Sequence, residues 1–446
     1  MRTRWLYFRL FGLTAAIATG AYWVQLPGLN AIWPLAGNVR PFFDGPSLLA
    51  LSTDWRLVQA LAAASFVSAL LVMFDVAVPF ALAALFIAWG SLVNVGQPFL
   101  SFQWDLLLCE AALLSIPYAL RPKAEPQLWQ RMFVALVAVK ITLESGIVKL
   151  SAGDASWWPD LTALTYHYWT QPLPAWTSVF IDRSPVFVHK VSCVAMFVLE
   201  LGFPLLAFGT RRMRHVSAAG MIALQVGLAV AGNYAYFNLL CAVLCVPLIE
   251  REPPPKERWL PQLGWPAFGL TALLTAVVFL QQFRPGYPEA VQLALYRLQA
   301  FNVVHSYGVF RVMTKTRPEI IFEGSDDGVT WKTYELKWKP GRVDRRPTFI
   351  APWQPRLDWQ LWFAAMGSCE LWVQLFLREL LRGTPDVLAL LEADPFGGRP
   401  PRYLRTTLYQ YRFAPPGSSD WWIRSEVGPY CPPVMLDGQG RLVRAQ

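Results

Sequence analysis

Charged residues are scarce in this chain of 446 residues. Only 15% of the residues are Asp, Glu, Lys or Arg and 54% are hydrophobic, whereas soluble domains carry about a quarter charged residues. This shortage excludes an ordinary soluble enzyme and indicates that lipid forms part of the solvent. The net charge of +9 does not predict nucleic-acid binding, because the positive residues fall mainly in short connections between apolar runs, where they orient the chain and contact anionic lipid.

Motifs of soluble catalysis and of metal binding are also missing. The six cysteines form no CxxC, and neither GxSxG nor GxxxxGK occurs. The four histidines show no HExxH or paired spacing; they are His167, His189, His215 and His305. We therefore expect no metal site and no cofactor, and we do not expect the chain to be an ordinary lipase itself.

Long apolar runs, by contrast, are plentiful. About 20 mostly apolar residues span the hydrocarbon core of a bilayer. About nine stretches meet this need: 6–24, 57–74, 76–93, 99–120, 129–150, 186–208, 213–231, 234–249 and 264–283. The second and third adjoin so closely that we expect a hairpin. The first shows no cleavable signal peptide and is expected to stay as an anchor.

Positive charge is distributed unevenly between the connections of these stretches, which sets the orientation. With a cytoplasmic N-terminus, the inner connections hold Arg2, Arg4, Arg121, Lys123, Arg131, Arg211, Arg212, Arg214, Arg251, Lys256 and Arg258. The outer connections hold only Arg40, Arg56 and Arg183, with Lys149 and Lys190 at helix edges. We therefore predict that everything after residue 283 lies on the outer side.

Two domains are predicted, a transmembrane helical bundle at 1–283 and an extracytoplasmic domain at 284–446. Within the bundle, the outer connection 151–185 is rich in aromatic residues and proline. It is too polar to span and too apolar for a free loop, so we expect a re-entrant or interfacial segment at the outer mouth.

The tail after residue 283 has a mixed α and β pattern and no apolar run long enough to cross a membrane. A β-hairpin is predicted at 320–338 around a Ser-Asp-Asp-Gly turn. Helical spacing appears at 357–367 and 371–381, with another short helix from Thr384, and strand-like alternation returns at 403–413 and 421–427. The predicted fold of the tail is an α+β domain, a β-sandwich with helical insertions.

Charged residues inside the apolar stretches are the candidates for chemistry. They are Arg9, Asp105, Glu110, Lys140, Glu144 and Glu200. Each costs ~2.5–3.5 kcal/mol near a helix centre, so they must face the bundle interior or water. Depth along the stretches pairs Lys140 with Glu110 near the midplane and places Glu144 with Asp105 nearer the outer face. Two interpretations stay open, a polar catalytic centre and a buried ion-pair network that fixes helix packing.

Cys369 and Cys431 are the cysteines of the tail. If the tail is exported to an oxidising compartment, a disulfide between them is a possibility. A Cα separation beyond ~7 Å would exclude it.

Seven strings, in order along the chain, carry a family resemblance. They are LSFQWDLLLCE (100–110), DLTALTYHYWTQPLP (160–174), AGNYAYFNLL (231–240), FNVVHSYGVF (301–310), RLDWQLWFAA (356–365), PPRYLR (400–405) and WWIRSEVGPYCPP (421–433). Together they resemble the lipase maturation factor family. Matched positions that are candidates for binding, with no assigned roles, are Tyr166, His167, Tyr168, Trp169, Gln171, Asn233 and Asn238.

This resemblance implies a multi-spanning membrane protein without agreed catalytic residues. The animal members reside in the endoplasmic reticulum and are needed for secreted lipases to fold and assemble into active dimers. The excess of Arg over Lys favours a bacterial source. We therefore expect an inner-membrane protein with a periplasmic C-terminal domain, or an ER membrane protein with a lumenal one if the source is eukaryotic. The layout also looks like the vitamin K-dependent carboxylase type of membrane enzyme, by architecture only.

Two functions from different classes follow. The first is a non-enzymatic maturation factor that holds a secreted lipase client at the outer membrane surface, with membrane lipids around it. The second is a membrane enzyme acting on a lipid or quinone-like substrate through Lys140, Glu144, Asp105 and Glu110. A continuous cavity from these residues to the outer surface favours the enzyme, and a dry, paired network beneath an exposed apolar patch favours the factor.

Overall fold

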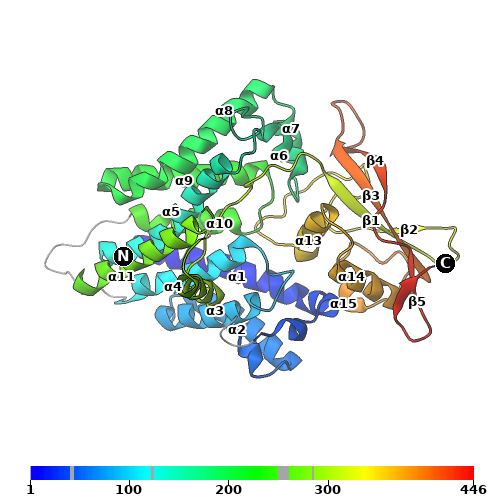
Figure 1. Cartoon of the computed structure of the whole chain (residues 1–446), viewed down its shortest axis with the longest axis horizontal. Helices are drawn as coiled ribbons and strands as arrows, with labels where there is room; N and C mark the ends of the chain where they lie inside the picture. Colours follow the sequence, from blue (N-terminus) through cyan, green and yellow to red (C-terminus); the bar gives the residue numbers. More distant parts are fainter. Residues whose placement is uncertain (1, 41–44, 122–124, 250–260, 284–285, 446) are drawn as a thin grey trace.

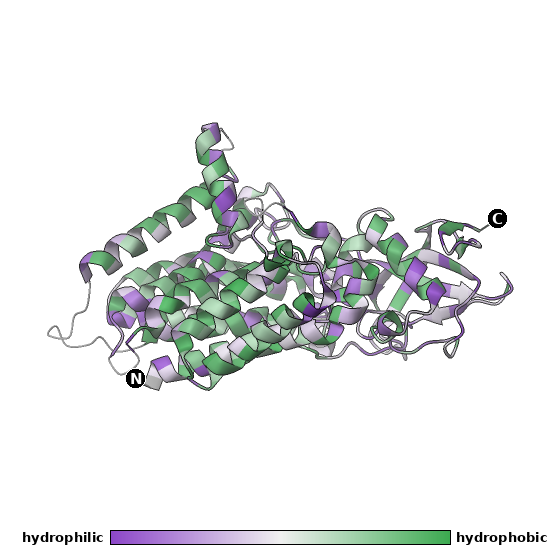
Figure 2. Cartoon of the chain, turned by 90° about the horizontal axis from the view of Figure 1, so that it is seen from below, coloured by the Kyte–Doolittle hydropathy of each residue, from purple (hydrophilic) through white to green (hydrophobic). Residues whose placement is uncertain are grey.

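The computed structural model describes residues 2–40, 45–121, 125–249, 261–283 and 286–445. Lys123, Arg251, Lys256 and Arg258 of the orientation argument lie outside these residues. Helices form one end of the molecule and a β-sheet forms the other, with the two chain termini at opposite ends (Figure 1). Apolar residues predominate along the middle of the bundle helices, and hydrophilic residues are more frequent at their ends and in the sheet-containing part (Figure 2).

All nine predicted apolar stretches are helical, some with interruptions. The helices are α1 (Arg2–Ile32), α2 (Trp55–Met73), α3 (Val78–Val93), α4 (Gln103–Ala119), α5 (Leu128–Ser151), α8 (Val186–Phe197), α9 (Arg211–Ala231), α10 (Phe237–Leu244) and α11 (Pro261–Leu280). The predicted hairpin of α2 and α3 is present, and these two helices pack side by side.

Four helical segments in the described part of the chain are long and apolar enough to cross a membrane. They are Trp55–Met73, Val186–Phe208, Arg211–Ala231 and Pro261–Leu280. The N-terminal part is therefore a membrane domain, and the count of nine spans stays a prediction.

The central helix of the bundle is α5, which contacts α4, α10 and α11. Nearly all of its side chains are buried, including Lys140, Glu144 and Lys149. Polar groups on such a helix have no water to bond with, so they must find partners inside the protein.

An irregular stretch follows α8 and faces α5. The helix widens into a π-helical turn, η4 (Val198–Gly202), and then tightens into a 3₁₀ turn, η5 (Pro204–Phe208). Gly146 of α5 permits this contact, because a Cβ there would lie only 2.7 Å from the Leu201 side chain. The wide turn places Glu200 inside the bundle.

The sheet-containing domain has six antiparallel strands in one sheet. They are β1 (Pro318–Ser325), β2 (Lys332–Tyr334), β3 (Tyr403–Phe413), β4 (Trp422–Pro429), β5 (Val434–Leu436) and β6 (Leu442–Arg444). The order is β2-β1-β3-β5-β6, and β4 also pairs with β3. The pairing of β1 with β2 confirms the predicted hairpin.

The predicted β-sandwich is wrong, since the described strands form a single sheet. Helices take the place of a second sheet: α13 (Arg356–Ala365), α14 (Leu371–Arg382) and α15 (Pro385–Leu388). They lie between the bundle and the sheet (Figure 1). The apolar face of α14 packs on the sheet, with the Phe376 ring 5.2 Å from that of Phe322. An amphipathic helix can bury the face of a sheet as well as a second sheet can.

The bundle and the sheet-containing domain are in direct contact. The end of α1 packs against α15, and Gly28 makes this possible because a Cβ there would lie 2.4 Å from the Asp386 carbonyl oxygen. The aromatic connection 151–185 forms two short helices, α6 (Leu164–Thr170) and α7 (Trp176–Asp182). Much of it is buried, and its contact with a membrane stays a prediction.

Candidate functional site

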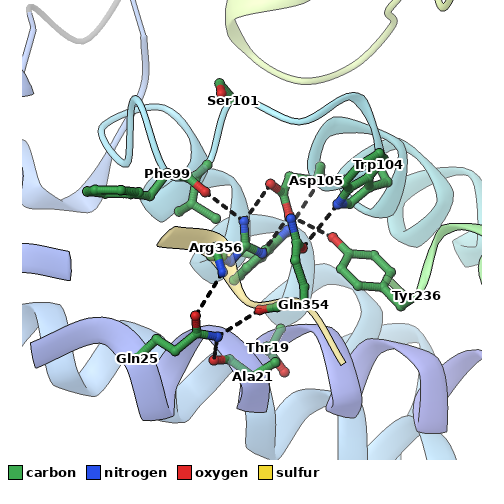
Figure 3. A network of polar contacts seen from close by, with 12 residues as sticks. Thr19, Ala21, Gln25, Phe99, Ser101, Trp104, Asp105, Tyr236, Gln354 and Arg356 are labelled. Carbon is green, nitrogen blue, oxygen red and sulfur yellow. Dashed lines mark hydrogen bonds and ion pairs between the residues drawn. The ribbon is translucent and has the colours of Figure 1, made fainter. Parts of the chain in front are cut away.

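Asp105, in the first turn of α4, forms a fully buried ion pair with Arg356, the first residue of α13 (Figure 3). The guanidinium donates Nη1 to Oδ2 and Nη2 to Oδ1, both at 2.8 Å. The Tyr236 hydroxyl donates to Oδ1 at 2.6 Å. This two-pronged geometry is the strongest that an arginine can make with a carboxylate, so it fixes the start of α13 against α4.

Further hydrogen bonds extend this network to α1. The backbone N–H of Arg356 donates to Gln25 Oε1 at 2.8 Å, and Gln25 Nε2 donates to the Gln354 carbonyl oxygen at 2.8 Å. Trp104 Nε1 donates to Gln354 Oε1 at 3.0 Å, and Arg356 Nη1 donates to the Phe99 carbonyl oxygen at 2.8 Å. The network therefore joins the bundle to the sheet-containing domain (Figure 3).

A second buried network surrounds Lys140. Its ammonium pairs with Glu110, as depth along the stretches predicts, and also donates to the His305 carbonyl oxygen at 2.9 Å. The Tyr307 hydroxyl donates to Glu110 Oε2 at 2.7 Å, and the Tyr307 backbone N–H donates to Glu144 Oε2 at 2.7 Å. These bonds hold the segment after α12 (Glu289–Ala300) inside the bundle.

The predicted placement of Glu144 with Asp105 is wrong. Asp105 pairs with Arg356, and Glu144 accepts from Tyr307. Depth along the apolar stretches could suggest partners only within those stretches. The actual partners come from the tail, which folds back into the bundle and supplies a cation and backbone donors.

Lys149 and Glu200 form a third buried pair beside a small cavity, the inner pocket. Lys149 Nζ donates to the two carboxylate oxygens at 2.7 and 2.9 Å. The cavity measures about 50 Å³, and its lining includes this pair together with His167, Gln225 and Asn238. Most of the remaining lining is apolar.

His167 of α6 takes part in a hydrogen-bonded chain at the edge of the inner pocket. The Tyr234 hydroxyl donates to Gln171 Oε1 at 2.6 Å, so its oxygen must accept from His167 Nε2, which lies 2.7 Å away. His167 Nδ1 is then an acceptor, and it has no partner. Burial, together with the positive charge of Lys149, lowers the pKa of His167 to about 4, so the ring is neutral at physiological pH.

The other matched positions lie at the junction of the two parts. Asn233 donates to the Leu173 and Thr348 carbonyl oxygens at 3.1 and 2.8 Å. Its own side-chain oxygen accepts from the backbone N–H groups of Ile350 and Ala351. Asn233 therefore ties the aromatic connection to the sheet-containing domain.

Aromatic members of the matched set make cation–π and ring contacts. The Arg412 guanidinium lies 4.6 Å from the Trp169 ring centroid, and Lys315 Nζ lies 5.9 Å from that of Tyr166. The Tyr168 ring packs 5.5 Å from that of His189. These contacts are structural, and a role in ligand binding is left as a prediction for these three positions.

A larger cavity, the aromatic cleft, lies where the bundle meets α13. It measures about 550 Å³. Its lining includes Phe102, Trp104, Tyr234, Phe310, Trp359, Gln360, Trp362, Phe363, Met366 and Trp372. Three lining side chains expose apolar surface to the outside, with exposed fractions of 62% for Val312, 47% for Phe363 and 42% for Met366. Large apolar surfaces of this kind mark interaction sites.

The four charged candidates do not reach either cavity. Asp105, Glu110, Lys140 and Glu144 are at most 4% exposed, and they line neither the inner pocket nor the aromatic cleft. Within the described parts of the chain, no group of three or more His, Cys, Asp or Glu is placed to hold a metal ion.

Cys369 and Cys431 are joined by a disulfide, with 5.5 Å between their Cα atoms. The bond links the segment before α14 to the segment after β4. Cys109, Cys193, Cys241 and Cys245 are free and buried.

Gln25, Tyr236, Tyr307 and Arg356 belong to the networks but were not predicted from the sequence. Three of them lie inside the seven strings, where an aromatic or basic residue within an apolar context was the available signal. Gln25 carried no such signal, because a single Gln at the end of an apolar stretch has no distinguishing pattern.

Comparison with known proteins gives the family. The chain matches the lipase maturation factor transmembrane domain over residues 2–253 and the lipase maturation factor C-terminal domain over residues 303–432. Lipase maturation factor 2 of Mus musculus is 31% identical across 94% of this chain and 81% of its own length. Lipase maturation factor 2 of Homo sapiens is 30% identical across 97% and 82%.

Lipase maturation factor 1 of Bos taurus is 33% identical across 79% of this chain and 71% of its own length. No solved structure matches the chain. The identities and the coverage confirm what the seven strings predict, and the chain belongs to the lipase maturation factor family.

Proposed function

We propose that this protein is a membrane-bound maturation factor for secreted lipases and that the aromatic cleft holds an extended segment of the client. The relatives are named for lipase maturation, and the cleft has the size and chemistry of a peptide-binding groove. Its volume of about 550 Å³ falls within the range of protein ligand sites, roughly 300–1,000 Å³.

The observation that carries the proposal is a pair of unused hydrogen-bonding groups on two residues that line the cleft. Trp359 Nε1 is a buried donor without a partner, and Gln360 Oε1 is a buried acceptor without a partner. Both residues line the cleft. A peptide group offers one C=O and one N–H, so an extended segment would supply both missing partners.

The apolar lining suits a client of variable sequence. Tryptophan and phenylalanine rings offer large contact areas, and Met366 adapts its shape to different side chains. Glu370 and Arg311 are charged residues of opposite sign at the same cleft, so the site has no net preference for a charged client. Promiscuous binders of partly folded chains use surfaces of this kind.

The buried networks supply the rigidity that such a site needs. The Asp105–Arg356 pair fixes the start of α13, the helix that carries Trp359, Gln360 and Phe363. A groove held by buried ion pairs loses little conformational entropy on binding. The intramembrane charges then serve as anchors, since Lys140 is buried and paired with Glu110.

The positive-charge bias supports a position of the cleft on the outer side of the membrane, where secreted clients emerge. A cysteine introduced at Trp338, which is 38% exposed in the sheet-containing domain, tests this orientation. The proposal expects labelling of position 338 by an impermeant thiol reagent in intact cells. Labelling only after the cytoplasmic side is opened contradicts the orientation and the placement of the cleft.

Site-specific photo-crosslinking tests the cleft itself. A photoreactive amino acid at Phe363 or Met366 should capture a co-expressed secreted lipase while the lipase folds. The matched control is Val329, which is also apolar and is 81% exposed on the turn after β1. Equal capture from position 329 contradicts a specific role for the cleft.

A functional readout accompanies the crosslink. The double change Phe363→Ser and Met366→Ser removes exposed apolar surface without touching a buried residue, so the protein should still fold. We expect a several-fold lower yield of active secreted lipase from this variant, and an unchanged yield from Val329→Ser. Full lipase yield from the double variant overturns client holding by the cleft.

A further inference from the structure

Three polar atoms in the inner pocket are buried without partners. They are His167 Nδ1, Gln225 Oε1 and Asn238 Oδ1, on side chains that are 4%, 5% and 6% exposed. The three residues come from α6, α9 and α10, yet they line one cavity. An unpaired buried polar group costs about 1–3 kcal/mol, so three around one cavity indicate a bound molecule that makes hydrogen bonds.

His167 Nδ1 is an acceptor, because the other ring nitrogen donates to Tyr234. Gln225 and Asn238 each end in an amide group, which offers one acceptor and two donors. The missing ligand must therefore carry an N–H or O–H group for His167 and further polar atoms for the two amides. An ester, an ether or a hydrocarbon without a hydroxyl would leave His167 Nδ1 unpaired.

The pocket carries no net charge. Lys149 contributes one positive charge and Glu200 one negative charge, and both oxygens of the carboxylate accept from the same ammonium. The ammonium also lies 5.5 Å from the Trp157 ring centroid. A charged ligand would be buried without a free counter-ion, which is costly, so the matched ligand is neutral.

The rest of the lining is mainly hydrocarbon and aromatic, including Leu164, Met196, Leu224 and Phe237. The cavity of about 50 Å³ holds roughly three to five water-sized groups, since each needs at least ~10–15 Å³. That space suits a small polar head group, with the first carbons of a chain against the apolar side chains.

We propose that the inner pocket binds the hydroxyl-bearing head group of a neutral lipid, the chemical class of the mono- and diacylglycerols. One hydroxyl donates to His167 Nδ1, and the other oxygen atoms of the head group bond with the amide groups of Gln225 and Asn238. The ion pair of Lys149 with Glu200 forms part of the polar wall. The site adjoins the aromatic cleft, because Tyr234 and Phe310 line both cavities. It does not depend on the proposed client binding, since its acceptors are separate from the groups in the cleft.

Ligand selectivity tests the proposal on the unaltered full chain. Purified protein in detergent is incubated with tritiated 1-monooleoylglycerol, and bound lipid is measured with unlabelled competitors. We expect saturable binding that monooleoylglycerol displaces. Methyl oleate has the same chain and no hydroxyl, and oleate is an anion, so each should compete at least tenfold less well. Equal competition by methyl oleate, or no saturable binding because water alone fills the pocket, overturns the proposal.

Variants locate the site. Gln225→Leu and Asn238→Leu each remove one unpaired amide group and should weaken binding by about 3- to 10-fold, the effect of one hydrogen bond. Thr275→Val is the matched control, because Thr275 Oγ1 is also buried without a partner but lines neither the inner pocket nor the aromatic cleft. Unchanged binding in both pocket variants, with thermal unfolding showing that they are folded, places the lipid elsewhere.

Discussion

Buried charge is the dominant feature at the scale of single residues. Lys140 and Glu110 are 3% and 0% exposed, and Asp105 and Arg356 are fully buried. Desolvating such groups is costly, and the cost is offset only when each charge has a counter-ion and its remaining hydrogen bonds are made. The backbone oxygen of His305 completes the shell of Lys140. Removing one partner of a buried ion pair should therefore destabilise the protein more than removing both partners.

We expect Lys140→Met to destabilise the protein by ~3–5 kcal/mol, because it leaves Glu110 buried without its cation. The double change with Glu110→Leu should be much milder. Thermal unfolding of the detergent-solubilised protein measures both. Lys315→Met serves as the control, since Lys315 is 51% exposed and Asp154 keeps its hydrogen bonds from Met313 and Ser156 after the change. The expected loss is at most ~1 kcal/mol. A double variant as unstable as the single one contradicts the ion-pair explanation.

His167 makes stability depend on pH. Its pKa is lowered to about 4 in the folded protein, by burial first and by Lys149 second, whereas an unfolded histidine titrates near ~6.5. Between these values the unfolded chain binds the proton and the folded chain does not. The contribution of His167 to the free energy of unfolding is therefore fully present above pH ~6.5. It is lost as the pH falls from there through the folded pKa, by about 3 kcal/mol in total.

The comparison of the unaltered protein with His167→Gln isolates this contribution. Glutamine does not titrate and can still donate to the Tyr234 hydroxyl. Unfolding temperatures measured from pH 7 to pH 4.5 should fall more steeply for the unaltered protein than for the variant. If the unfolding temperatures of the two proteins fall equally with pH, His167 is not the cause of the pH dependence.

At the scale of elements, several segments of the tail act as inserts rather than as parts of the sheet. The segment after α12 enters the bundle and meets Glu110 and Glu144 through Tyr307. Helices α13 and α14 form the layer between the bundle and the sheet (Figure 1). The disulfide between Cys369 and Cys431 then joins this helical layer to the strands.

Loss of the disulfide should loosen that layer. The bond closes a loop with a sequence separation of 62 residues, and removal of such a bond costs roughly 2–4 kcal/mol. We expect a lower unfolding temperature after reduction of the unaltered protein, and a similar decrease in the Cys369→Ser, Cys431→Ser double variant. Reductant should not lower the double variant further. If it does, another disulfide is responsible for the effect.

At the scale of the whole molecule, the bundle and the sheet-containing domain are joined by polar contacts as well as by apolar packing. Arg356 connects α13 to α4, and Asn233 connects the end of α9 to the segment before α13. Arg317 Nη2 donates to the Pro172 carbonyl oxygen of the aromatic connection at 2.9 Å. These directional contacts fix the relative position of the two parts, which apolar packing alone does less strictly.

Arg356→Met should therefore separate the two parts. It leaves Asp105 buried without a cation, at a cost of ~3–5 kcal/mol. We expect faster proteolytic release of the sheet-containing domain and a lower unfolding temperature. Arg378→Met is the matched control, because Arg378 pairs with Glu379 inside one helix and Glu379 keeps Arg382 as a second cation. Proteolysis as slow as in the control contradicts a role for Arg356 in holding the parts together.

Several features followed from the sequence with little ambiguity. The apolar stretches became helices because about 20 consecutive apolar residues favour internally hydrogen-bonded structure in lipid. Strand β3 has the predicted bounds, and α13 and α14 lie within a residue or two of theirs. These elements depend on local periodicity, which the chain displays directly. The pairing of Lys140 with Glu110 was also predictable, since depth in neighbouring stretches limits the choice of partners.

What the sequence alone determined is therefore the local part of the protein: its membrane character, its elements and its family. The tertiary structure decided which distant groups meet. Arg356 lies 251 positions from Asp105, and Tyr307 lies 163 positions from Glu144, so no local pattern connects them. The inner pocket and the aromatic cleft likewise combine residues from separate elements. Long-range contacts of this kind depend on how the elements pack, because burial selects the whole arrangement that satisfies every charge and polar group together.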